Sequence, residues 1–300
     1  MRLSIIIPTY NNWPVISRVL PAVLAQAGDA EVLVVDSSDD GTTERLRESF
    51  AQIRLLHPPQ RLLPGPARNL GASEACGDVL VFLDGDCLPG PGWLDAFRAT
   101  VTTLESAIVC GSVDLHEPSD LSQFMEYLLW KLPENSRVQR GPYDFVVSEN
   151  MMIRKDQFTD IGGFGDSDSG NDIQMDVARR RLGVPLTFEP SARVLHIHPR
   201  GWRLHMRKLY RVGAETAALI SDFKNGQELE RYPMGWWMTR LLPIVFLVRW
   251  VRITGRVLRY RPDWVGRYLM VQPMLLIGLL AHQAGLARGL LRGHHSQGSK

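Results

Sequence analysis

Short apolar runs alternate with amphipathic stretches along the first part of the chain. Short, largely apolar runs predict buried strands at 3–7, 31–35, 53–56 and 79–83. The stretches between them have helical spacing and predict helices near 14–26, 42–51 and 66–76. Because fully apolar strands separated by helices are typical of a parallel sheet covered on both faces, this part of the chain predicts an α/β fold.

Beyond residue 91 the pattern is less regular but still alternates. It predicts, in order, a helix near 92–105, a strand near 107–113, a helix near 119–132, a strand near 143–148, a helix near 169–182, an extended segment at 185–195 and a long helix near 200–223. We interpret residues 1–230 as one α/β domain with a Rossmann-like, mostly parallel sheet flanked by helices. Residues 231–300 are interpreted as a separate helical, amphipathic tail.

Charge divides the chain at the same place. Residues 231–300 contain 11 Lys and Arg against one acid, Asp263, and so carry +10, which leaves −8 for residues 1–230. Large apolar side chains are interleaved with these basic residues, at Trp236, Trp237 and in the runs 241–253 and 269–287. This combination favours a helix that lies on an anionic membrane surface.

Two other interpretations of the tail stay open. It can be a helical layer packed in a soluble protein, with its arginines toward water. A membrane-spanning helix needs about 20 apolar residues, and the run 269–287 approaches that length but is interrupted by Gln272, Pro273, His282 and Gln283. No recognition motif accompanies the basic residues, so we expect no nucleic-acid partner.

Composition excludes several classes of protein. With 45% hydrophobic and 22% charged residues, the chain is neither disordered nor fibrous. Cys76, Cys87 and Cys110 form no CxxC motif and no Cys/His zinc spacing, which favours a reducing compartment. The first apolar run has no small-residue cleavage site after it and is interpreted as a strand, not as a signal peptide. We expect a cytoplasmic protein, peripheral on the inner face of the cell membrane.

Polar residues follow three of the predicted strands. In an open α/β sheet, the loops at the carboxyl ends of the strands converge on the ligand. The residues in these positions are Pro8, Thr9, Tyr10 and Asn11 after the first strand, Asp36 after the second, and Asp84, Gly85 and Asp86 after the fourth. The sequence therefore predicts a binding site at this edge of the sheet.

The turn Asp84-Gly85-Asp86 has the chemistry of a metal site. Two carboxylates around a glycine reach a divalent ion and a ribose from one turn, and Mg²⁺ or Mn²⁺ binds carboxylate oxygens while leaving positions for phosphate. Asp36, at the end of a buried strand, predicts a contact with a ribose or a base. Arg68 and Asn69 lie near the start of a predicted helix, where a cation and backbone N–H groups can bind phosphate.

Four blocks of the sequence carry a family resemblance: SIIIPTYNN, VVDSSDDGT, GPARNLGASEACGDVLVFLDGDC and SENMMIRKDQFTDIGGF. In order and spacing they resemble the family 2 glycosyltransferases of the GT-A fold, over roughly residues 3–215. The resemblance implies an inverting hexosyl- or deoxyhexosyltransferase that uses a nucleotide-diphosphate sugar and a divalent metal, Mn²⁺ or Mg²⁺. It also implies nucleotide contacts by Thr9, Tyr10, Asp36, Arg68 and Asp84, and metal binding by Asp86.

The resemblance also implies a catalytic base at Asp172. Family members usually carry an acidic pair that opens a helix after the GGF block, and here the pair is Asn171-Asp172. Inverting transfer needs one carboxylate to deprotonate the acceptor hydroxyl, whereas a glycosidase needs two facing carboxyl groups. Asn171 can equally serve as an N-cap of the helix. If the alignment is shifted, Asp166 and Asp168 are the alternative bases.

Two histidines follow the extended segment at 185–195. Residues two apart in a strand lie on the same face, so His196 and His198 are both placed to face the site. In many family members a histidine at the end of this strand approaches the metal, and the His-x-His form resembles rhamnosyltransferase-like members. The resemblance therefore implies His196 and His198 as metal ligands beside Asp86.

We therefore expect transfer of a sugar to a glycan or a lipid-linked acceptor. Two other classes stay open. One is a nucleotidyltransferase built on the same sheet, although the block around Asp172 has no obvious role there. The other is a non-catalytic scaffold that binds glycan or nucleotide, in which Asn171 marks lost activity.

Overall fold

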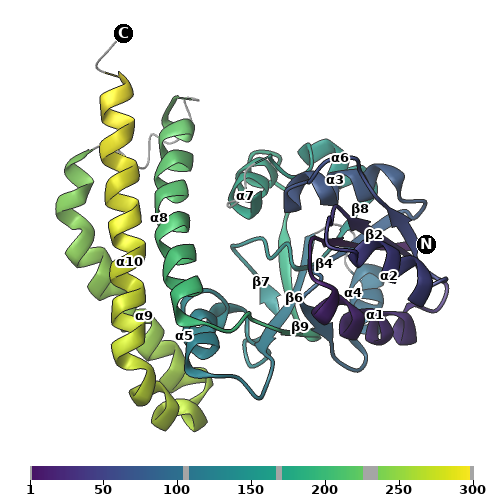
Figure 1. Ribbon diagram of the computed structural model, residues 1–300, viewed down its shortest axis with the longest axis horizontal. Helices are drawn as coiled ribbons and strands as arrows, with labels where there is room; N and C mark the ends of the chain where they lie inside the picture. Colours follow the sequence, from purple (N-terminus) through teal and green to yellow (C-terminus); the bar gives the residue numbers. More distant parts are fainter. Residues whose placement is uncertain (1, 104–107, 167–170, 226–235, 298–300) are drawn as a thin grey trace. The chain divides into compact units, whose positions relative to one another are not determined.

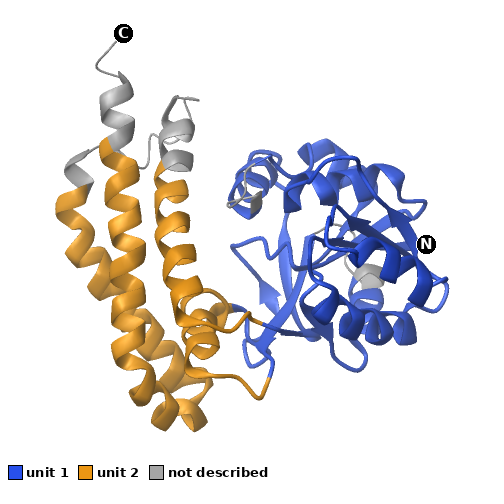
Figure 2. Ribbon diagram, in the orientation of Figure 1, with its two compact units in different colours: residues 1–116, 134–197 blue, residues 117–133, 198–300 orange. Residues whose placement is uncertain are grey.

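The chain divides into two compact units. The computed structural model describes residues 2–103, 108–166, 171–225 and 236–297. Unit 1 comprises residues 1–116 and 134–197, and unit 2 comprises residues 117–133 and 198–300 (Figure 2). The predicted boundary at residue 230 lies outside the described residues. The units divide the chain elsewhere, because the helices expected near 119–132 and 200–223 belong to the C-terminal unit.

A nine-stranded sheet forms the centre of unit 1 (Figure 1). Its strands are β1 (Leu3–Thr9), β2 (Glu31–Asp36), β3 (Arg54–Leu56), β4 (Val79–Leu83), β5 (Cys87–Pro89), β6 (Ile108–Leu115), β7 (Gly141–Pro142), β8 (Asn150–Arg154) and β9 (Leu186–His196). Their order is β3-β2-β1-β4-β8-β6-β9-β5, with β7 paired to β9. Pairing is parallel from β3 to β4 and between β6 and β9, and antiparallel at the remaining pairs.

Helices connect and cover these strands. In unit 1 they are α1 (Trp13–Ala27), α2 (Thr42–Ser49), α3 (Pro64–Glu74), α4 (Trp93–Thr103), α6 (Lys155–Ile161) and α7 (Asn171–Arg181). Ile5, Ile6 and Ile7 of β1 are all fully buried, so both faces of the sheet are covered there. This double burial explains why the first strands are mostly apolar, and it confirms the predicted α/β fold.

The first four strands place a crevice at one edge of the sheet. From β1 the chain continues to β2 on one side, whereas β4 pairs with the other side of β1. The loops that follow β1 and β4 therefore leave in different directions. In an open α/β sheet, such a reversal of strand order is where ligands bind.

One predicted strand is wrong. Residues 143–149 form no strand, although Val146 and Val147 are buried, and the strand lies at β8 instead. β8 pairs antiparallel with both β4 and β6. Its sequence contains two methionines and only one β-branched residue, so the pairing on both sides, not local propensity, determines this strand.

Asn150 ties together three segments of unit 1. The ladder between β6 and β9 shifts register between Gly111 and Ser112. The Asn150 side chain fills this irregularity, where its Nδ2 donates to the carbonyl of Ser112 at 2.9 Å and to that of Ala192 at 2.7 Å. Its Oδ1 accepts from Nε1 of Trp93 at 2.8 Å. One buried amide thus satisfies three polar groups.

Replacing Asn150 by Ala is expected to lower the free energy of unfolding by about 3 kcal/mol or more, because each buried group left unpaired costs about 1–3 kcal/mol. Urea titration followed by circular dichroism measures this loss. Ser73→Ala, which removes one exposed hydrogen bond to Leu70, is the control and should change stability by less than about 0.5 kcal/mol. A loss below 1 kcal/mol for Asn150→Ala would contradict the role of this amide.

Unit 2 is a helical layer. Its α-helices are α5 (Leu121–Trp130), α8 (Trp202–Asn225), α9 (Leu242–Tyr260) and α10 (Val265–Gln297). The short 3₁₀ helices are η2 (Trp236–Leu241), η3 (Pro262–Trp264) and η1 (Leu132–Glu134), and η1 leads back to unit 1. Helices α8 and α10 approach closely at glycines. A Cβ on Gly213 would lie 2.1 Å from the carbonyl oxygen of His282, and one on Gly285 would lie 1.9 Å from that of Tyr210. No larger side chain fits at either position without moving the helices apart.

One stretch of unit 2 is long and apolar enough to cross a membrane. It runs from Pro262 to Leu291, and 39% of its most apolar window is buried within the protein. Length and composition are the only evidence for a membrane-spanning helix. The core helix of a soluble protein can have the same two properties. The three interpretations of the tail therefore stay predictions.

His282 makes the stability of unit 2 sensitive to acid. The side chain lies in α10 near Trp130, with ring centroids 5.5 Å apart. Burial, and to a smaller extent the charge of Arg249, lowers its pKa to about 4. In the unfolded chain, His282 becomes protonated as the pH falls below about 6.5. In the folded chain it becomes protonated only near pH 4. Stability from this neutral histidine is therefore present above pH 6.5 and is lost as the pH falls toward 4.

For His282→Gln we expect a flatter stability profile between pH 7 and pH 4. The difference from the unchanged chain should reach about 3 kcal/mol, since each pKa unit corresponds to about 1.4 kcal/mol. Urea unfolding of the full chain at half-unit pH steps measures it. Parallel profiles for the two proteins would show that His282 does not titrate on unfolding.

Candidate active site

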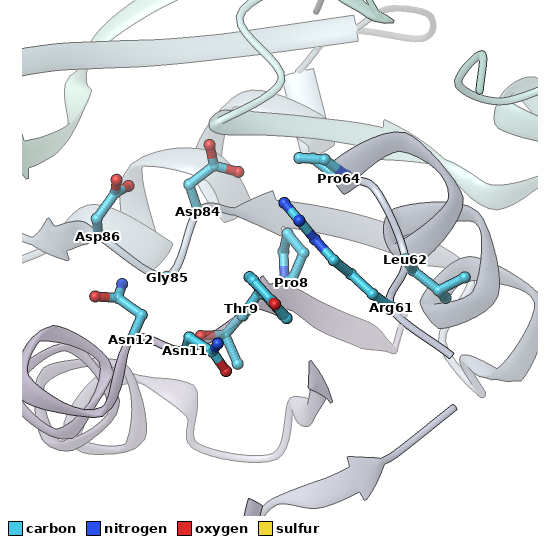
Figure 3. Close-up of a pocket in the computed structure, with 11 residues that line it drawn as sticks. Pro8, Thr9, Asn11, Asn12, Arg61, Leu62, Pro64, Asp84, Gly85 and Asp86 are labelled. Atoms are coloured by element: carbon cyan, nitrogen blue, oxygen red, sulfur yellow. The ribbon is translucent and has the colours of Figure 1, made fainter. Parts of the chain in front are cut away.

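A pocket of about 270 Å³ opens where the strand order reverses (Figure 3). It lies between the loop after β1 and the turn after β4. The residues that line it are Pro8, Thr9, Tyr10, Asn11, Asn12, Arg61, Leu62, Pro64, Asp84, Gly85 and Asp86. Seven of these were predicted from the sequence, because the rule for strand ends identifies both loops.

Gly85 allows the acidic turn to lie directly on β1. A Cβ at this position would be 3.1 Å from the carbonyl oxygen of Pro8 and 3.5 Å from Cβ of Thr9. The turn is closed by a hydrogen bond from the Cys87 amide to the Asp84 carbonyl at 3.0 Å. Asp84 and Asp86 therefore stand on either side of a glycine at which a larger side chain would crowd the Pro8 carbonyl.

Asn11 joins the loops after β1 and β2. Its backbone has φ = 48°, a left-handed conformation that asparagine tolerates better than most residues. The backbone amide donates to Oγ of Ser38 at 2.7 Å, and the side chain exchanges two hydrogen bonds with Asp39. Asn11 thus lines the pocket and also fixes the shape of its rim.

Asp36 is fully buried at the end of β2. Its carboxylate accepts hydrogen bonds from the hydroxyl groups of Ser38 and Thr43, the latter at 2.5 Å. These bonds hold the loop that carries Asp39, the partner of Asn11. The structure thus gives Asp36 a role in shaping the rim, and its predicted contact with the nucleotide stays a prediction.

Arg68 is buried behind the acidic turn. Its guanidinium forms an ion pair with Asp84, and its Cζ lies 5.2 Å from the ring centroid of Phe164. Burial lowers the pKa of Arg68, but the charges of Asp84 and then Asp172 outweigh it and raise that pKa above its usual value. Arg68 is therefore a permanent cation that links Asp84 electrostatically to Asp172.

Asn69 holds the loop that leads to Asp172. Its Nδ2 donates to the carbonyl of Phe164 at 2.7 Å, and its Oδ1 accepts from the amide of the same residue at 2.9 Å. Gly163 has a left-handed φ of 72°, and a Cβ there would lie 2.7 Å from Oδ1 of Asn69. Both ends of the amide make hydrogen bonds inside the protein, so the structure gives Asn69 a positioning role, and its predicted contact with phosphate stays a prediction.

Asp172 lies in the first turn of α7, which begins at Asn171. Its charge acts on Arg68, so it belongs to the electrostatic environment of the pocket. Of the two alternative bases, Asp166 is exposed and Asp168 lies outside the described residues. Asp172 thus remains the candidate base that the structure connects to the site.

Asp86 and His196 come together at the end of β9. The antiparallel pairing of β5 with β9 sets Cys87 opposite His196, and the amide of Ile197 donates to the Asp86 carbonyl at 2.8 Å. Nε2 of His196 lies 3.6 Å from Oδ1 of Asp86. One ligand atom from each of Asp86, Cys87 and His196 lies within 4.8 Å of the others. The Asp86 carboxylate is the type of ligand that Mn²⁺ and Mg²⁺ prefer, and His196 adds a nitrogen donor beside it.

His198 has different neighbours. Strand β9 ends at His196, so the spacing rule that put both histidines on one face does not reach His198. His198 belongs to unit 2, where its Nδ1 is 3.4 Å from a carboxylate oxygen of Glu126. The same oxygen is 2.5 Å from Nδ1 of His205, and the other carboxylate oxygen is 2.5 Å from Nζ of Lys208. Within the described residues, His198 is not part of the cluster formed by Asp86 and His196.

Comparison with known proteins identifies the family. The model of the family described as Glycosyl transferase family 2 matches residues 4–162, which is more than half of the chain. The chain belongs to this family. The protein is therefore a glycosyltransferase that uses nucleotide sugars, as the four sequence blocks predicted.

Two relatives show how far the similarity of this transferase extends. It is 30% identical over 223 residues to Glycosyltransferase AglE of Haloferax volcanii, covering 70% of this chain and 71% of that protein. It is also 30% identical over 237 residues to human Polypeptide N-acetylgalactosaminyltransferase 12, but that match covers 66% of this chain and 40% of the human protein.

Two solved structures share the fold of this transferase. One is the mannosyltransferase PcManGT of Pyrobaculum calidifontis in complex with GDP-Man and Mn²⁺, with a TM-score of 0.56, 18% identity and coverage of 95% of this chain and 86% of that one. The other is S. aureus TarS 1–349 in complex with UDP-GlcNAc, with a TM-score of 0.56, 16% identity and coverage of 99% and 92%. The likeness confirms the predicted GT-A architecture.

Four residues that line the pocket were not predicted from the sequence. They are Asn12, Arg61, Leu62 and Pro64. Three of them lie just beyond β3, whose carboxyl end meets the same edge of the sheet, so the rule used for the other strands would have found them. Cζ of Arg61 lies 4.2 Å from the ring centroid of Tyr10, which places a cation beside the aromatic wall of the pocket.

Proposed function

We propose that this family 2 transferase moves a sugar with inversion from a nucleotide diphosphate to a hydroxyl acceptor. The observation that carries the proposal is the convergence of Asp84, Asp86, Tyr10 and Arg61 on one pocket at the strand-order reversal. Tyr10 offers a ring for the base, and Arg61 offers a cation at the rim for phosphate. The pair of Asp84 with Arg68 holds the acidic turn in place.

In this proposal Asp172 accepts the proton of the acceptor hydroxyl. The attacking oxygen then forms the new bond to the anomeric carbon while the bond to the diphosphate breaks, and the diphosphate leaves with the electron pair. A carboxylate that removes the proton accelerates such a step by about 10²–10⁴-fold. Arg68 stays charged throughout, and its interaction with the charge of Asp172 links the proposed base to the acidic turn.

Asp86 and His196 would hold the divalent ion, Mn²⁺ or Mg²⁺. When bound, the ion supplies positive charge where negative charge develops on the leaving diphosphate. Asp86 would contribute an oxygen from the acidic turn, and His196 a nitrogen from the end of β9. The thiol of the buried Cys87 lies within 4.8 Å of both ligand atoms, and it is the softest donor of the three.

The acceptor is proposed to be a glycan or a lipid-linked glycan precursor, reached at the inner face of the cell membrane. The support for this location is the +10 charge of residues 231–300 and the large apolar side chains that unit 2 exposes to solvent. Anionic lipids attract such segments.

The deciding experiment is a calorimetric titration of UDP, GDP and dTDP into the full chain with Mn²⁺, repeated with EDTA. We expect one nucleotide to bind tightly and to lose its affinity in EDTA. Structures with the same fold hold UDP-GlcNAc or GDP-Man, so at least two bases must be compared. Binding of no nucleotide would overturn the proposal, and binding without turnover on any acceptor would favour a non-catalytic scaffold.

A further inference from the structure

Helix α9 exposes an apolar face to solvent. Ile244, Leu247, Val251 and Leu258 are 59%, 55%, 53% and 58% exposed. At about 100° per residue these positions fall on one side of the helix. The buried Ile253 lies on the opposite side. A continuous exposed apolar face on a helix marks a surface that contacts something other than water.

Arginines run along one flank of that face. Arg249, Arg252, Arg256 and Arg259 follow at intervals of three, four and three residues, which keeps them in a single stripe between the exposed and the buried side. Within residues 236–297 the one acid is Asp263, which pairs with Arg261 at 2.9 Å. In the part of the chain that the structure describes, no carboxylate neutralises the stripe.

Arg249 is the innermost residue of the stripe. Its guanidinium donates to the carbonyl of Leu129 at 3.3 Å, and its Cζ lies 4.7 Å from the ring centroid of Trp130. Burial lowers its pKa to about 10, so it stays protonated at neutral pH. Arg249 therefore adds a positive charge to the edge of the stripe that is nearest the interior of unit 2.

A cavity of about 450 Å³ lies beside the stripe. It is lined by five aliphatic side chains, among them Leu129 and Val248, and by Arg249, Arg252 and Arg256. An aliphatic wall with three arginines at its edge suits a ligand with an anionic head and a hydrocarbon chain. Guanidinium groups bind phosphate and carboxylate alike with two hydrogen bonds. The aliphatic wall beside the arginines favours a phosphate that carries a hydrocarbon chain over a carboxylate on a protein surface.

We propose that α9 carries a binding site for an anionic phospholipid. The phosphate is held by Arg252 and Arg256, and the upper part of an acyl chain lies in the cavity against Leu129 and Val248. The exposed face around Leu247 and Val251 enters the acyl region of the same leaflet. This inference rests on the membrane attachment proposed above, and it specifies the residues and the lipid chemistry.

The test is sedimentation of the full chain with vesicles of phosphatidylcholine, alone or with 30 mol% phosphatidylglycerol (roughly the level that gives a strong surface potential). The test variant is Arg252→Gln/Arg256→Gln. The control is Arg203→Gln/Arg207→Gln, which removes the same charge from exposed positions on α8 of the same unit. We expect the test variant to lose about tenfold or more of its partitioning into the anionic vesicles, and the control to lose less than threefold.

Four outcomes would overturn the site. Equal losses in both variants would mean that only total charge matters. No loss in the test variant, with the unchanged chain still bound, would leave membrane attachment in place without this site. A dimer that dissociates in the test variant during analytical ultracentrifugation would assign the face to a second copy. No binding of the unchanged chain to vesicles would refute both the site and the attachment.

Donor binding provides the independent readout. Calorimetric affinity for the nucleotide should be the same in both arginine variants, because α9 belongs to unit 2 and the pocket to unit 1. A chain that binds nucleotide but no vesicles is a transferase without this lipid site. A chain that binds vesicles through Arg252 and Arg256 but binds no nucleotide keeps the site and loses the proposed reaction.

Discussion

Replacing Asp172 by Asn is expected to slow sugar transfer by orders of magnitude and to leave the affinity for the donor nucleotide within about twofold. The asparagine has nearly the same volume and keeps one oxygen, but it cannot take up the proton of the acceptor hydroxyl. The rate of transfer should fall by about 10²–10⁴-fold, the usual contribution of a positioned base. Single-turnover kinetics with saturating donor, together with calorimetric binding of the nucleotide, separate the two effects.

Asp166→Asn is the matched control, since Asp166 is exposed and precedes α7 by five residues. It should transfer at the unchanged rate. If Asp172→Asn keeps full activity while Asp166→Asn loses it, the alignment of the acceptor block is shifted and the base is Asp166. Full activity in both variants would remove the two described carboxylates from this role.

The second large effect is expected at Asp86. In Asp86→Asn, Mn²⁺-dependent affinity for the nucleotide should fall by about 100-fold or more, because even a change outside the direct ligands commonly costs 10–100-fold in metal affinity. The melting temperature should stay within about 2 °C, since the new side chain has the same size on a partly exposed turn. Titration of the nucleotide with Mn²⁺ and with EDTA measures the first quantity, and differential scanning calorimetry the second.

Asp95→Asn provides the control for Asp86. Asp95 is exposed on α4 and pairs at 3.6 Å with Arg98, so the variant has the same change of charge away from the pocket. Its Mn²⁺-dependent affinity should equal that of the unchanged chain. An unchanged affinity in Asp86→Asn would exclude this carboxylate as a metal ligand.

The N-terminal half of the fold could be predicted because local sequence patterns determine its strands and helices. Strands β1, β2 and β4 are buried on both faces, and the helices between them have their own periodic pattern. The acidic turn Asp84-Gly85-Asp86 could be found for the same reason, since a polar turn directly after a buried strand points to one edge of the sheet.

The rest depends on contacts between distant residues. β8 is a strand because it pairs with β4 on one side and β6 on the other. The residues at 150–154 have no local pattern that indicates these partners. His198 lies beside Glu126, which is 72 residues earlier in the sequence. The spacing of His196 and His198 indicates a common face only as long as the strand continues, and it ends between them.

The roles of Asp36 and Asn69 show a further limit. Residue type and position identified both as polar groups near the site, and both lie there. The hydrogen bonds of Asp36 with Ser38 and Thr43, and of Asn69 with Phe164, are made inside the protein. Position along a sheet edge can place a side chain near a site, but it does not say whether that side chain faces the ligand or supports a neighbour.

The path of the chain between its two units determines how the protein can be dissected. A cut near residue 230 would keep α5 and α8 and remove α10, the helix packed against both. The apolar sides of α5 and α8 would then be exposed, and such a fragment should aggregate. The amide of Ser136 donates to Oδ1 of Asp114 at 3.1 Å, so the two ends left by removing residues 117–133 lie close together in unit 1. A fragment that joins 1–116 to 134–197 through a short flexible linker is therefore the form in which the nucleotide pocket can be isolated.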